Sequence, residues 1–431
     1  MQRRRVLIVS HVFPPLVAGG APRMGQFARL LPEFGWDVTV VTAKHEGIDA
    51  SALAALDGRA TIVEAWSPAS AVVKRGTPTP KRGARSWARK ALRTVAMSVL
   101  FPDREIFWAP GAIAHGRRVL AATPHDVVLA THGPASNLVV GSALASAAKL
   151  PLVVDFRDLW STLPMSNAFV SPLHRAAAHR LEGAIVRAAS RVVAVAPNMA
   201  TELASTHGVS GERALSITNG FDPDDLARVH DARADGRRPF RLMYLGTVNA
   251  NYNLEPFWRA VKRLAEARRI TPETLRIEFV GNLAVADVRA YGVDAFIDTK
   301  PFVAHSKVFD ELARADALLM VETPGYYAHY SYAAKVFDYL VTGKPVLALV
   351  EAGGNTARLL GDAGVDHVAD PTDAGVIAGV LETLLRLKGA RPRVVRSLDP
   401  PFAAFDRRNL VRTLAAMLDD VAINEPHGSW S

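Results

Sequence analysis

Residues 126–156 read DVVLATHGPASNLVVGSALASAAKLPLVVDF. The first run, DVVLATH (126–132), and the last, PLVVDF (151–156), are mostly apolar rather than alternating, so both faces of each predicted strand are buried. The segment between the two runs has the length of a helix. Two such strands joined through a helix are the unit of a parallel sheet. This stretch therefore predicts an α/β fold.

The same alternation extends over most of the chain. In the first half, strands are predicted at 5–10, 37–42, 61–65, 126–132, 151–156 and 191–196, with helices between them, for example over 20–34 and 175–189. The pattern restarts near residue 222; residues 231–239 are polar, and further strands are predicted at 241–246, 276–281, 317–322 and 345–350. We expect two Rossmann-like doubly wound parallel-sheet domains, 1–222 and 223–405, with a ligand cleft at the carboxyl ends of their strands. A last helix within 406–431 could return to the first domain.

Composition restricts the class of protein. The chain has 431 residues, of which 49% are hydrophobic and 22% charged, a balance typical of globular domains with large cores. Cysteine is absent, which excludes disulfides and is compatible with the cytoplasmic location that we expect. The apolar run in MQRRRVLIVSHVFPP is too short for a signal peptide, and no run approaches the roughly 20 apolar residues of a membrane-spanning helix.

The net charge is +9, and the excess is concentrated between Glu64 and Asp103, where no acidic residue occurs. Trp87 lies in this interval together with Lys74, Arg75, Lys81, Arg82, Arg85, Arg89, Lys90 and Arg93. A run of this kind can bind an anionic membrane surface or an acidic partner, or it can be an ordinary solvated helix and loop. The sequence does not favour a nucleic-acid partner, because it lacks aromatic-interleaved strands and a helix-turn-helix.

Three polar sites follow predicted strands of the first domain. Gly19 and Gly20 open a helix after the first strand, where free backbone N–H groups suit a phosphate, although a simple glycine turn is an equal alternative. His132 ends the strand at 126–132, and a histidine there can bind a sugar hydroxyl or carry a proton. Asp155, Arg157 and Asp158 end the next strand and are either functional or an internal ion pair that fixes the loop.

Two groups of potential metal ligands occur in the sequence, but each is explained better without a metal. Asp222, Asp224 and Asp225 are clustered carboxylates, but Asp222 before Pro223 is better explained as the N-cap of a helix. His174 and His179 are five residues apart on a predicted helix, which puts them on different sides. We therefore predict no metal site.

In the second domain, residues 331–349 read SYAAKVFDYLVTGKPVLAL, an apolar helix followed by a strand. Lys335 and Asp338 are three residues apart and so share one helix face. One explanation for this pair is an i,i+3 ion pair on the helix surface.

Several motifs in order resemble those of bacterial glycosyltransferases of family 4, which have the GT-B fold. They are the strand, GG loop and helix over 5–34, DFRDLW (155–160), ITNGFD (217–222), YLGTVNANYNL (244–254), IEFVGN (277–282) and YAAKVFDYLVTGKPVLAL (332–349). The likeness covers about residues 5 to 385. It implies a retaining, metal-independent enzyme of the hexosyltransferase type that takes a sugar from a nucleotide diphosphate donor, with UDP or GDP as the nucleotide.

The resemblance also implies residue roles. Asp338 stands where the family has a glutamate that binds the donor ribose, and Lys335 would contact the diphosphate. Tyr330 stands where a second glutamate is common, so Glu322 could contact the sugar instead. Thr247 with asparagines stands where an arginine and a lysine that bind the diphosphate are common, so Lys335 could substitute for them. The donor-binding positions expected are Gly19, Gly20, Gly246, Thr247, Asn282, Phe302, Val303, Glu322, Lys335 and Asp338, while His132 would contact the donor sugar and Asp155, Arg157 and Asp158 would face the acceptor.

The acceptor implied is a saccharide, a lipid-linked sugar or a secondary metabolite, bound on the side of the first domain. A lipid-linked acceptor would agree with contact between residues 74–93 and the inner face of the plasma membrane. No cofactor other than the nucleotide sugar is expected. Two alternatives are a nucleotide-sugar epimerase on the same fold and, from another class, a basic protein that binds nucleic acid or membrane.

Overall fold

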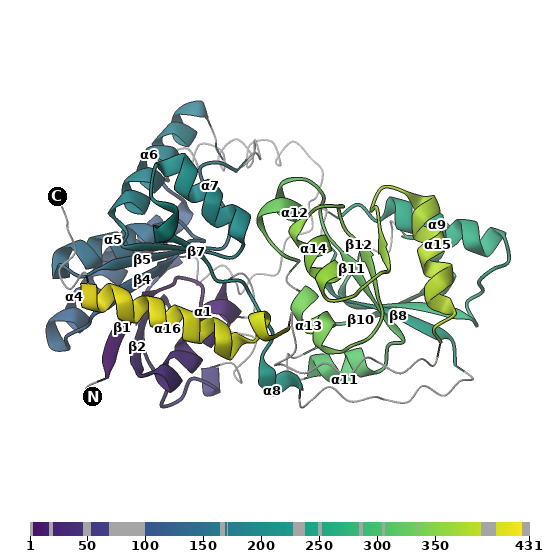
Figure 1. Cartoon of the computed structure of the whole chain (residues 1–431), viewed down its shortest axis with the longest axis horizontal. Helices are drawn as coiled ribbons and strands as arrows, with labels where there is room; N and C mark the ends of the chain where they lie inside the picture. The colour runs from purple at the N-terminus through teal and green to yellow at the C-terminus, as the bar shows by residue number, and fades with distance from the viewer. Residues whose placement is uncertain are drawn as a thin grey trace. The chain divides into compact units, whose positions relative to one another are not determined.

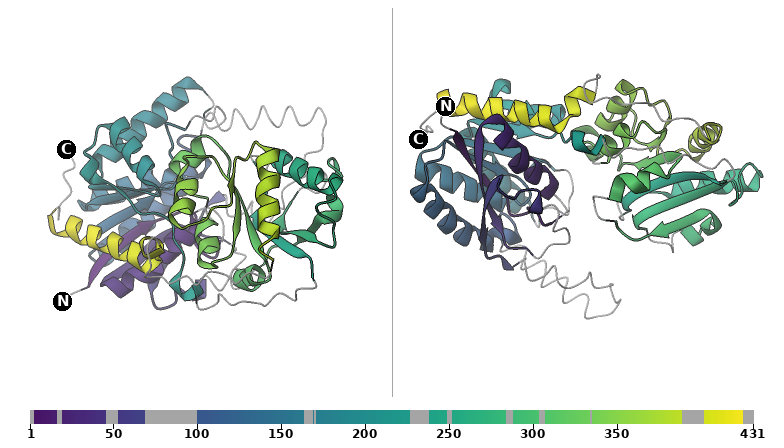
Figure 2. Two further views of the ribbon diagram at one scale, coloured as in Figure 1. Left: turned by 45° about the vertical axis from the view of Figure 1, so that its right-hand side comes forward. Right: turned by 90° about the horizontal axis from the view of Figure 1, so that it is seen from below.

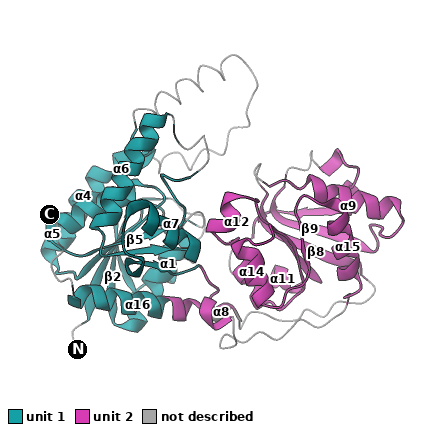
Figure 3. Cartoon of the chain, turned by 45° about the horizontal axis from the view of Figure 1, so that its top comes forward, with its two compact units in different colours: residues 1–218, 411–431 teal, residues 219–410 magenta. Residues whose placement is uncertain are grey.

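The computed structural model describes residues 3–16, 20–45, 53–68, 100–163, 169, 171–226, 238–248, 252–283, 288–303, 307–333, 335–388 and 402–424. Gly19 and the basic interval 74–93 lie outside these residues. The chain divides into two compact units (Figure 3), of which unit 1 comprises residues 1–218 and 411–431 and unit 2 comprises residues 219–410. The divisions predicted from the sequence, after residues 222 and 405, lie four residues later and five residues earlier than these.

Unit 1 contains a seven-stranded sheet in the order β3-β2-β1-β4-β5-β6-β7, with every neighbouring pair parallel (Figure 1). The six strands predicted for the first half are present, and a short edge strand is additional. The strands are β1 (Arg4–Val9), β2 (Trp36–Ala43), β3 (Ala60–Ala65), β4 (Val127–Thr131), β5 (Leu152–Phe156), β6 (Arg191–Ala194) and β7 (Ala214–Ser216).

Helices of unit 1 connect these strands. Their bounds are α1 (Ala21–Leu30), η1 (Leu31–Phe34), η3 (Arg104–Trp108), α4 (Ala109–Ala122), α5 (Ser136–Ala148), α6 (Pro172–Ala188), α7 (Pro197–His207) and η4 (Gly211–Arg213). α6 begins three residues before the helix predicted at 175–189, because the Ser171 side chain accepts a hydrogen bond from the backbone N–H of His174 and Pro172 occupies the first turn.

Unit 2 contains a six-stranded parallel sheet in the order β10-β9-β8-β11-β12-β13. Its four central strands are those predicted, and both edge strands are additional. The strands are β8 (Phe240–Thr247), β9 (Leu275–Asn282), β10 (Ile297–Lys300), β11 (Ala317–Val321), β12 (Val346–Leu349) and β13 (Val368–Ala369). The helices are α8 (Pro223–Leu226), α9 (Glu255–Glu266), η5 (Asp294–Phe296), α11 (Val308–Ala313), α12 (Tyr326–Tyr330), α13 (Val336–Val341), α14 (Asn355–Asp362), α15 (Ala374–Leu385) and η7 (Phe402–Phe405).

Two apolar cores lie on opposite faces of the unit 2 sheet. Leu242 and Tyr244 of β8 belong to one core, and Met243, between them, belongs to the other. The same division recurs in β11 and β12, because successive side chains of a strand point to opposite faces. Burial on both faces is what the apolar strands of the sequence predicted, and it makes each unit a doubly wound parallel-sheet domain.

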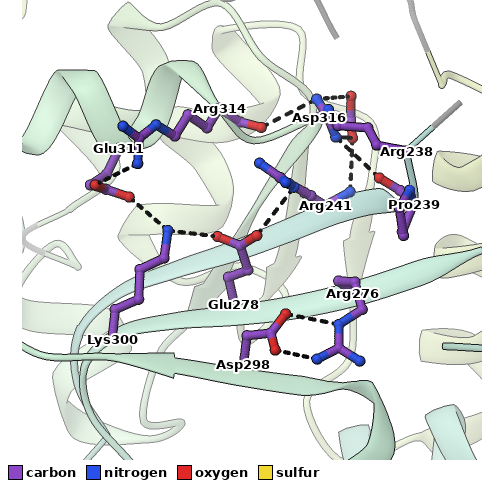
Figure 4. Close-up of polar contacts among 10 residues, drawn as sticks. All are labelled: Arg238, Pro239, Arg241, Arg276, Glu278, Asp298, Lys300, Glu311, Arg314 and Asp316. Carbon is purple, nitrogen blue, oxygen red and sulfur yellow. Dashed lines mark hydrogen bonds and ion pairs between the residues drawn. The ribbon is translucent and has the colours of Figure 1, made fainter. Parts of the chain in front are cut away.

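A polar network crosses one face of the unit 2 sheet (Figure 4). Glu278 of β9 is buried and accepts contacts from Arg241 of β8 and Lys300 of β10, both at 3.3 Å. Lys300 also donates to Glu311 of α11 at 3.0 Å. The network therefore joins three neighbouring strands to the helix that covers them.

The last helix, α16 (Arg407–Asn424), begins in unit 2 and continues in unit 1, where it is drawn in yellow in Figures 1 and 2. Its Asp419 pairs with Arg4 of β1, and its Asp420 accepts a hydrogen bond from Arg191 of β6 at 2.6 Å. Among the helices of the described ranges, none has both the length and the apolar character needed to cross a membrane.

Candidate functional site

The residues that could bind a donor lie at the carboxyl edge of the unit 2 sheet. Thr247 ends β8, Asn282 ends β9, Phe302 and Val303 follow β10, and Glu322 follows β11. Because the strands are parallel and adjacent in the order β10-β9-β8-β11, their carboxyl ends meet at one edge. Phe302 is 65% exposed, whereas Val303 packs on the core.

Two glycines allow a close approach of chains at this edge. Gly246 and Gly281 are register partners in β8 and β9, with φ of +122° and +135°, values that side-chain-bearing residues rarely adopt. A Cβ atom on Gly246 would lie 2.7 Å from Cε of Lys335. Glycine at position 246 is therefore what admits the Lys335 side chain to the end of β8.

Lys335 is the half-buried cation of this edge. Its Nζ donates to the Tyr244 hydroxyl at 2.6 Å and lies 3.9 Å from the centre of the Tyr244 ring. Burial lowers the pKa of Lys335 to about 8 and raises the pKa of Tyr244. The ion pairs found among the described residues do not include Lys335, so the alternative of an i,i+3 pair with Asp338 is not what the structure contains. A desolvated ammonium without a carboxylate partner is suited to an anionic ligand.

Asp338 lies in the first turn of α13, half-buried, three residues after Lys335. The next residue, Tyr339, is buried, and its hydroxyl accepts a hydrogen bond from the backbone N–H of Leu245 at 2.9 Å. This bond fixes the start of α13 to the end of β8. The helix is shorter than the sequence predicts, because Lys335 is its N-cap and residues 331–333 are irregular.

Glu322 is a buried carboxyl group beside this segment. Its Oε1 accepts a hydrogen bond from the Thr356 hydroxyl at 2.7 Å, while Oε2 is buried and has no hydrogen-bond partner among the described residues. Burial raises the pKa of Glu322 to about 7, so the group changes charge near neutral pH. Thr356 also accepts from the backbone N–H of Ala333 at 3.0 Å, which links Glu322 to the chain that leads into Lys335.

Tyr330, at the position where the resemblance has a glutamate, lies in α12 with its ring 4.8 Å from that of Tyr326. In the same helix His329 contacts Glu351 at 3.1 Å. An acidic side chain is thus close to α12, but it comes from the segment after β12 rather than from position 330.

In unit 1, the Arg157 side chain lies beside Gly20, at the start of α1. Its Nε donates to the His132 carbonyl at 3.1 Å and its Nη2 to the Gly133 carbonyl at 2.8 Å. A Cβ atom on Gly20 would lie 2.4 Å from Cζ of Arg157, so this glycine makes room for the guanidinium. A cation therefore lies at the N-cap of α1, while Asp158 beside it is exposed.

Asp155 is placed differently from the other candidates. Its carboxylate is fully buried, accepts from the Arg23 guanidinium at 2.7 Å and accepts from the Thr131 hydroxyl at 2.8 Å. Arg23 also donates to the carbonyl of Ile217 at 2.8 Å. The expectation that Asp155 faces an acceptor disagrees with this burial; the carboxylate instead holds Arg23 between α1 and the end of unit 1.

His132 is buried, with its ring centroid 5.5 Å from that of Phe156 and 5.9 Å from that of Trp160, both stacked. Burial lowers the pKa of His132, so the ring is neutral at physiological pH. Its Nδ1 is buried without a hydrogen-bond partner among the described residues. The ring can accept or donate a hydrogen bond, but it does not supply a positive charge.

Asp222 caps the N-terminus of α8, as the sequence predicts. Its Oδ1 accepts from the backbone N–H of Asp224 at 3.1 Å at the start of α8, and Asp224 is paired with Arg408 at 3.2 Å. These contacts agree with the interpretation of Asp222 as an N-cap.

Part of the chain matches a known protein family. Residues 17–225 match the family model of Glycosyltransferase Family 4. This part of the chain is therefore similar to glycosyltransferases of family 4. Among curated proteins, no match was found.

Solved structures confirm the GT-B fold of the chain. A glycosyltransferase from Rickettsia africae ESF-5 is 11% identical with a TM-score of 0.62, over 98% of this chain and 99% of that one. A sucrose-phosphate synthase from Thermosynechococcus elongatus is 14% identical with a TM-score of 0.61, over 98% and 97%. A UDP-N-acetylglucosamine 2-epimerase is 15% identical over 95% and 90%, but its TM-score is only 0.48.

Several residues that build this candidate site could not be recognised in the sequence. Tyr244 is indistinguishable from a core residue in the strand RLMYLG, yet its hydroxyl meets Lys335. Thr356 and Glu351 come from segments that carry no motif, and only the tertiary structure brings them to Glu322 and His329.

Proposed function

We propose that this protein is a retaining glycosyltransferase that moves a sugar from a nucleotide diphosphate donor to a saccharide, lipid-linked sugar or small-molecule acceptor. The observation that carries the proposal is Lys335: a half-buried ammonium at the carboxyl edge of a Rossmann-like sheet, beside two glycines of positive φ and without an acidic partner among the described ion pairs. The family 4 match of residues 17–225 supports it.

Each donor-side residue then has a chemical role. Lys335 neutralises the diphosphate, and its charge matters most when the sugar–phosphate bond breaks and negative charge accumulates on the leaving group. Asp338 accepts hydrogen bonds from the ribose hydroxyls. Glu322, whose pKa is raised to about 7, contacts the donor sugar with either a protonated or an ionised carboxyl group. Gly246, Thr247 and Asn282 offer backbone close to the phosphates and the base.

In unit 1, neutral His132 contacts the donor sugar, and Arg157 with the exposed Asp158 shapes the acceptor pocket. Asp155 supports this region through Arg23 rather than through the acceptor. We assign no metal to the transfer step, which runs on the charges of the chain itself.

The test compares Lys335→Gln with wild type by calorimetric titration of UDP, GDP and the matching nucleosides. A hydrogen bond to a charged group is worth about 1.5–3 kcal/mol, so we expect a loss of about 10- to 100-fold for the diphosphates and none for the nucleosides. Lys307→Gln, an exposed lysine in the same unit, is the matched control. Equal diphosphate affinity in wild type and Lys335→Gln would reject the assignment.

The reaction type is tested separately with labelled nucleotide sugars. A transferase releases nucleoside diphosphate and passes the label to an added acceptor, whereas an epimerase converts the nucleotide sugar to an isomer without an acceptor. Formation of the isomer alone would replace this proposal by the epimerase alternative.

A further inference from the structure

Three potential metal ligands meet between two helices of unit 1, apart from the donor residues of unit 2. His179 and Glu182 are three residues apart on α6, and His207 is the last residue of α7. One ligand atom from each lies within 4.8 Å of the other two. Residues at i and i+3 of a helix share a face, so the α6 pair presents both groups in the same direction.

Two of the three ligand groups are buried and incompletely satisfied. The side chains of Glu182 and His207 are 0% and 1% exposed. Oε1 of Glu182 and Nε2 of His207 have no hydrogen-bond partner among the described residues, although Nε2 lies 3.4 Å from Oε2 of Glu182. A buried carboxylate oxygen and a buried imidazole nitrogen are costly to leave unpaired, and a bound cation would satisfy both.

Ser161 holds two of the ligands in place. Its backbone N–H donates to Oε2 of Glu182 at 3.0 Å, and its hydroxyl contacts Nδ1 of His179 at 3.1 Å. These contacts leave Oε1 of Glu182 and Nε2 of His179 for a cation. Outer contacts of this kind orient the ligands of metal sites and fix the histidine tautomer.

The cluster is also open to solvent on one side. His179 is exposed, which provides a route for a cation and a position for water.

We propose that His179, Glu182 and His207 bind a transition-metal dication of the Zn²⁺ type, with water as the fourth ligand. Two imidazoles and one carboxylate are a common tetrahedral ligand set for zinc, whereas Mg²⁺ and Ca²⁺ prefer oxygen ligands. The cation joins α6 to α7 and to Ser161. The prediction from His174 and His179 that α6 carries no zinc site considered the wrong pair, because the partners of His179 are Glu182 and a residue of the next helix.

The proposal is tested on full-length protein without an affinity tag, stripped with EDTA and then titrated with ZnCl₂ or MgCl₂. We expect zinc to raise the melting temperature of wild type and to remain bound at about one equivalent after gel filtration, because a ligand that binds only the folded state stabilises it. Magnesium should have no such effect.

The variants separate this site from general surface binding. His179→Ala removes an exposed side chain and should weaken zinc affinity at least tenfold, while His174→Ala, on the same helix outside the cluster, should bind as wild type does. Glu182→Gln keeps the shape of the buried side chain and should also lose zinc. Replacement by Co²⁺ should give the visible absorption of a tetrahedral site. The proposal is wrong if His179→Ala binds zinc as tightly as wild type, or if magnesium stabilises as well as zinc.

Discussion

Lys335 shows how the surroundings of one side chain change its chemistry. Burial against Tyr244 lowers the pKa of its ammonium to about 8, and the glycine at 246 leaves room for its Cε. The charge is therefore retained near neutral pH in a partly desolvated place, where it interacts more strongly with a phosphate than an exposed lysine does. A motif can reveal the lysine, but only the structure reveals this environment.

This environment predicts a pH dependence of donor binding. Below about pH 8 the empty site carries the ammonium, and above it the neutral amine, so the affinity for UDP or GDP should fall as pH rises and approach a loss of about tenfold per pH unit. Titrations above about pH 7.5 avoid the charge change of Glu322 near 7. Lys335→Gln should show a flat profile, and a wild-type profile that is equally flat would contradict the prediction.

A second prediction concerns Asp338, which we propose binds the ribose of the donor rather than its diphosphate. If its carboxylate accepts hydrogen bonds from the ribose, Asp338→Ala should weaken nucleotide binding by roughly tenfold, because about 1.5 kcal/mol is lost with such a bond. Asp338→Glu should retain more of the affinity. Deoxyribonucleoside diphosphates serve as the control, since the alanine variant should no longer distinguish them from the ribonucleotides. Unchanged nucleotide affinity in Asp338→Ala would remove the residue from the site.

Among the secondary-structure elements, the central strands could be predicted, whereas three of the four edge strands could not; the exception is β3, predicted at 61–65. β4 and β5 are apolar on both faces because helices cover both, and this is visible in the sequence. β10 reads IDTK, lies at the edge of its sheet and has half-buried or exposed residues, while β7 and β13 are edge strands of three and two residues. An edge strand is buried less, so it lacks the apolar run that marks a strand.

The candidate site could also be predicted only in part. Thr247, Asn282 and Glu322 each end an apolar strand, so their common edge follows from the parallel topology. The burial of Asp155 does not, because it depends on Arg23 from a helix 132 residues earlier in the chain. Ion pairs between distant segments leave no periodic signal, and the sequence therefore could not distinguish a functional carboxylate from a structural one.

We expect Glu278 to contribute to the stability of the unit 2 sheet. The carboxylate lies between Arg241 and Lys300 of the neighbouring strands (Figure 4), and Glu278→Gln keeps its shape but removes its charge. We expect a loss of about 1–2 kcal/mol in the free energy of unfolding, less than for a fully buried pair because both cations are partly exposed. Urea denaturation measures this. Arg259→Gln, in an exposed pair on α9, is the control and should change stability by less than about 0.5 kcal/mol. Equal effects of the two substitutions would show that the network contributes nothing beyond a surface pair.

For the molecule as a whole, the proposed donor residues and the basic interval belong to different parts of the chain. The residues assigned to the nucleotide belong mainly to unit 2, whereas the basic interval 74–93 belongs to unit 1 and lies outside the described residues. Two exposed aromatic side chains, Trp66 at 71% and Phe107 at 58%, flank the interval in sequence. Exposed aromatic groups near basic residues are typical of proteins that bind at a membrane surface.

This arrangement predicts that the basic interval serves a lipid-linked acceptor rather than the donor. Arg85, Arg89 and Arg93 have the spacing of one helix face, and each contributes about 1 kcal/mol near an anionic surface. Replacing all three with glutamine should abolish sedimentation with anionic vesicles at low salt and leave the affinity for UDP or GDP unchanged. Removing three exposed charges from unit 2, with Lys262, Arg268 and Arg289 changed to glutamine, lowers the net charge equally and should leave sedimentation intact. If the two triple variants lose vesicle binding to the same extent, net charge alone explains it; if wild type does not sediment with the vesicles, the acceptor is a soluble molecule.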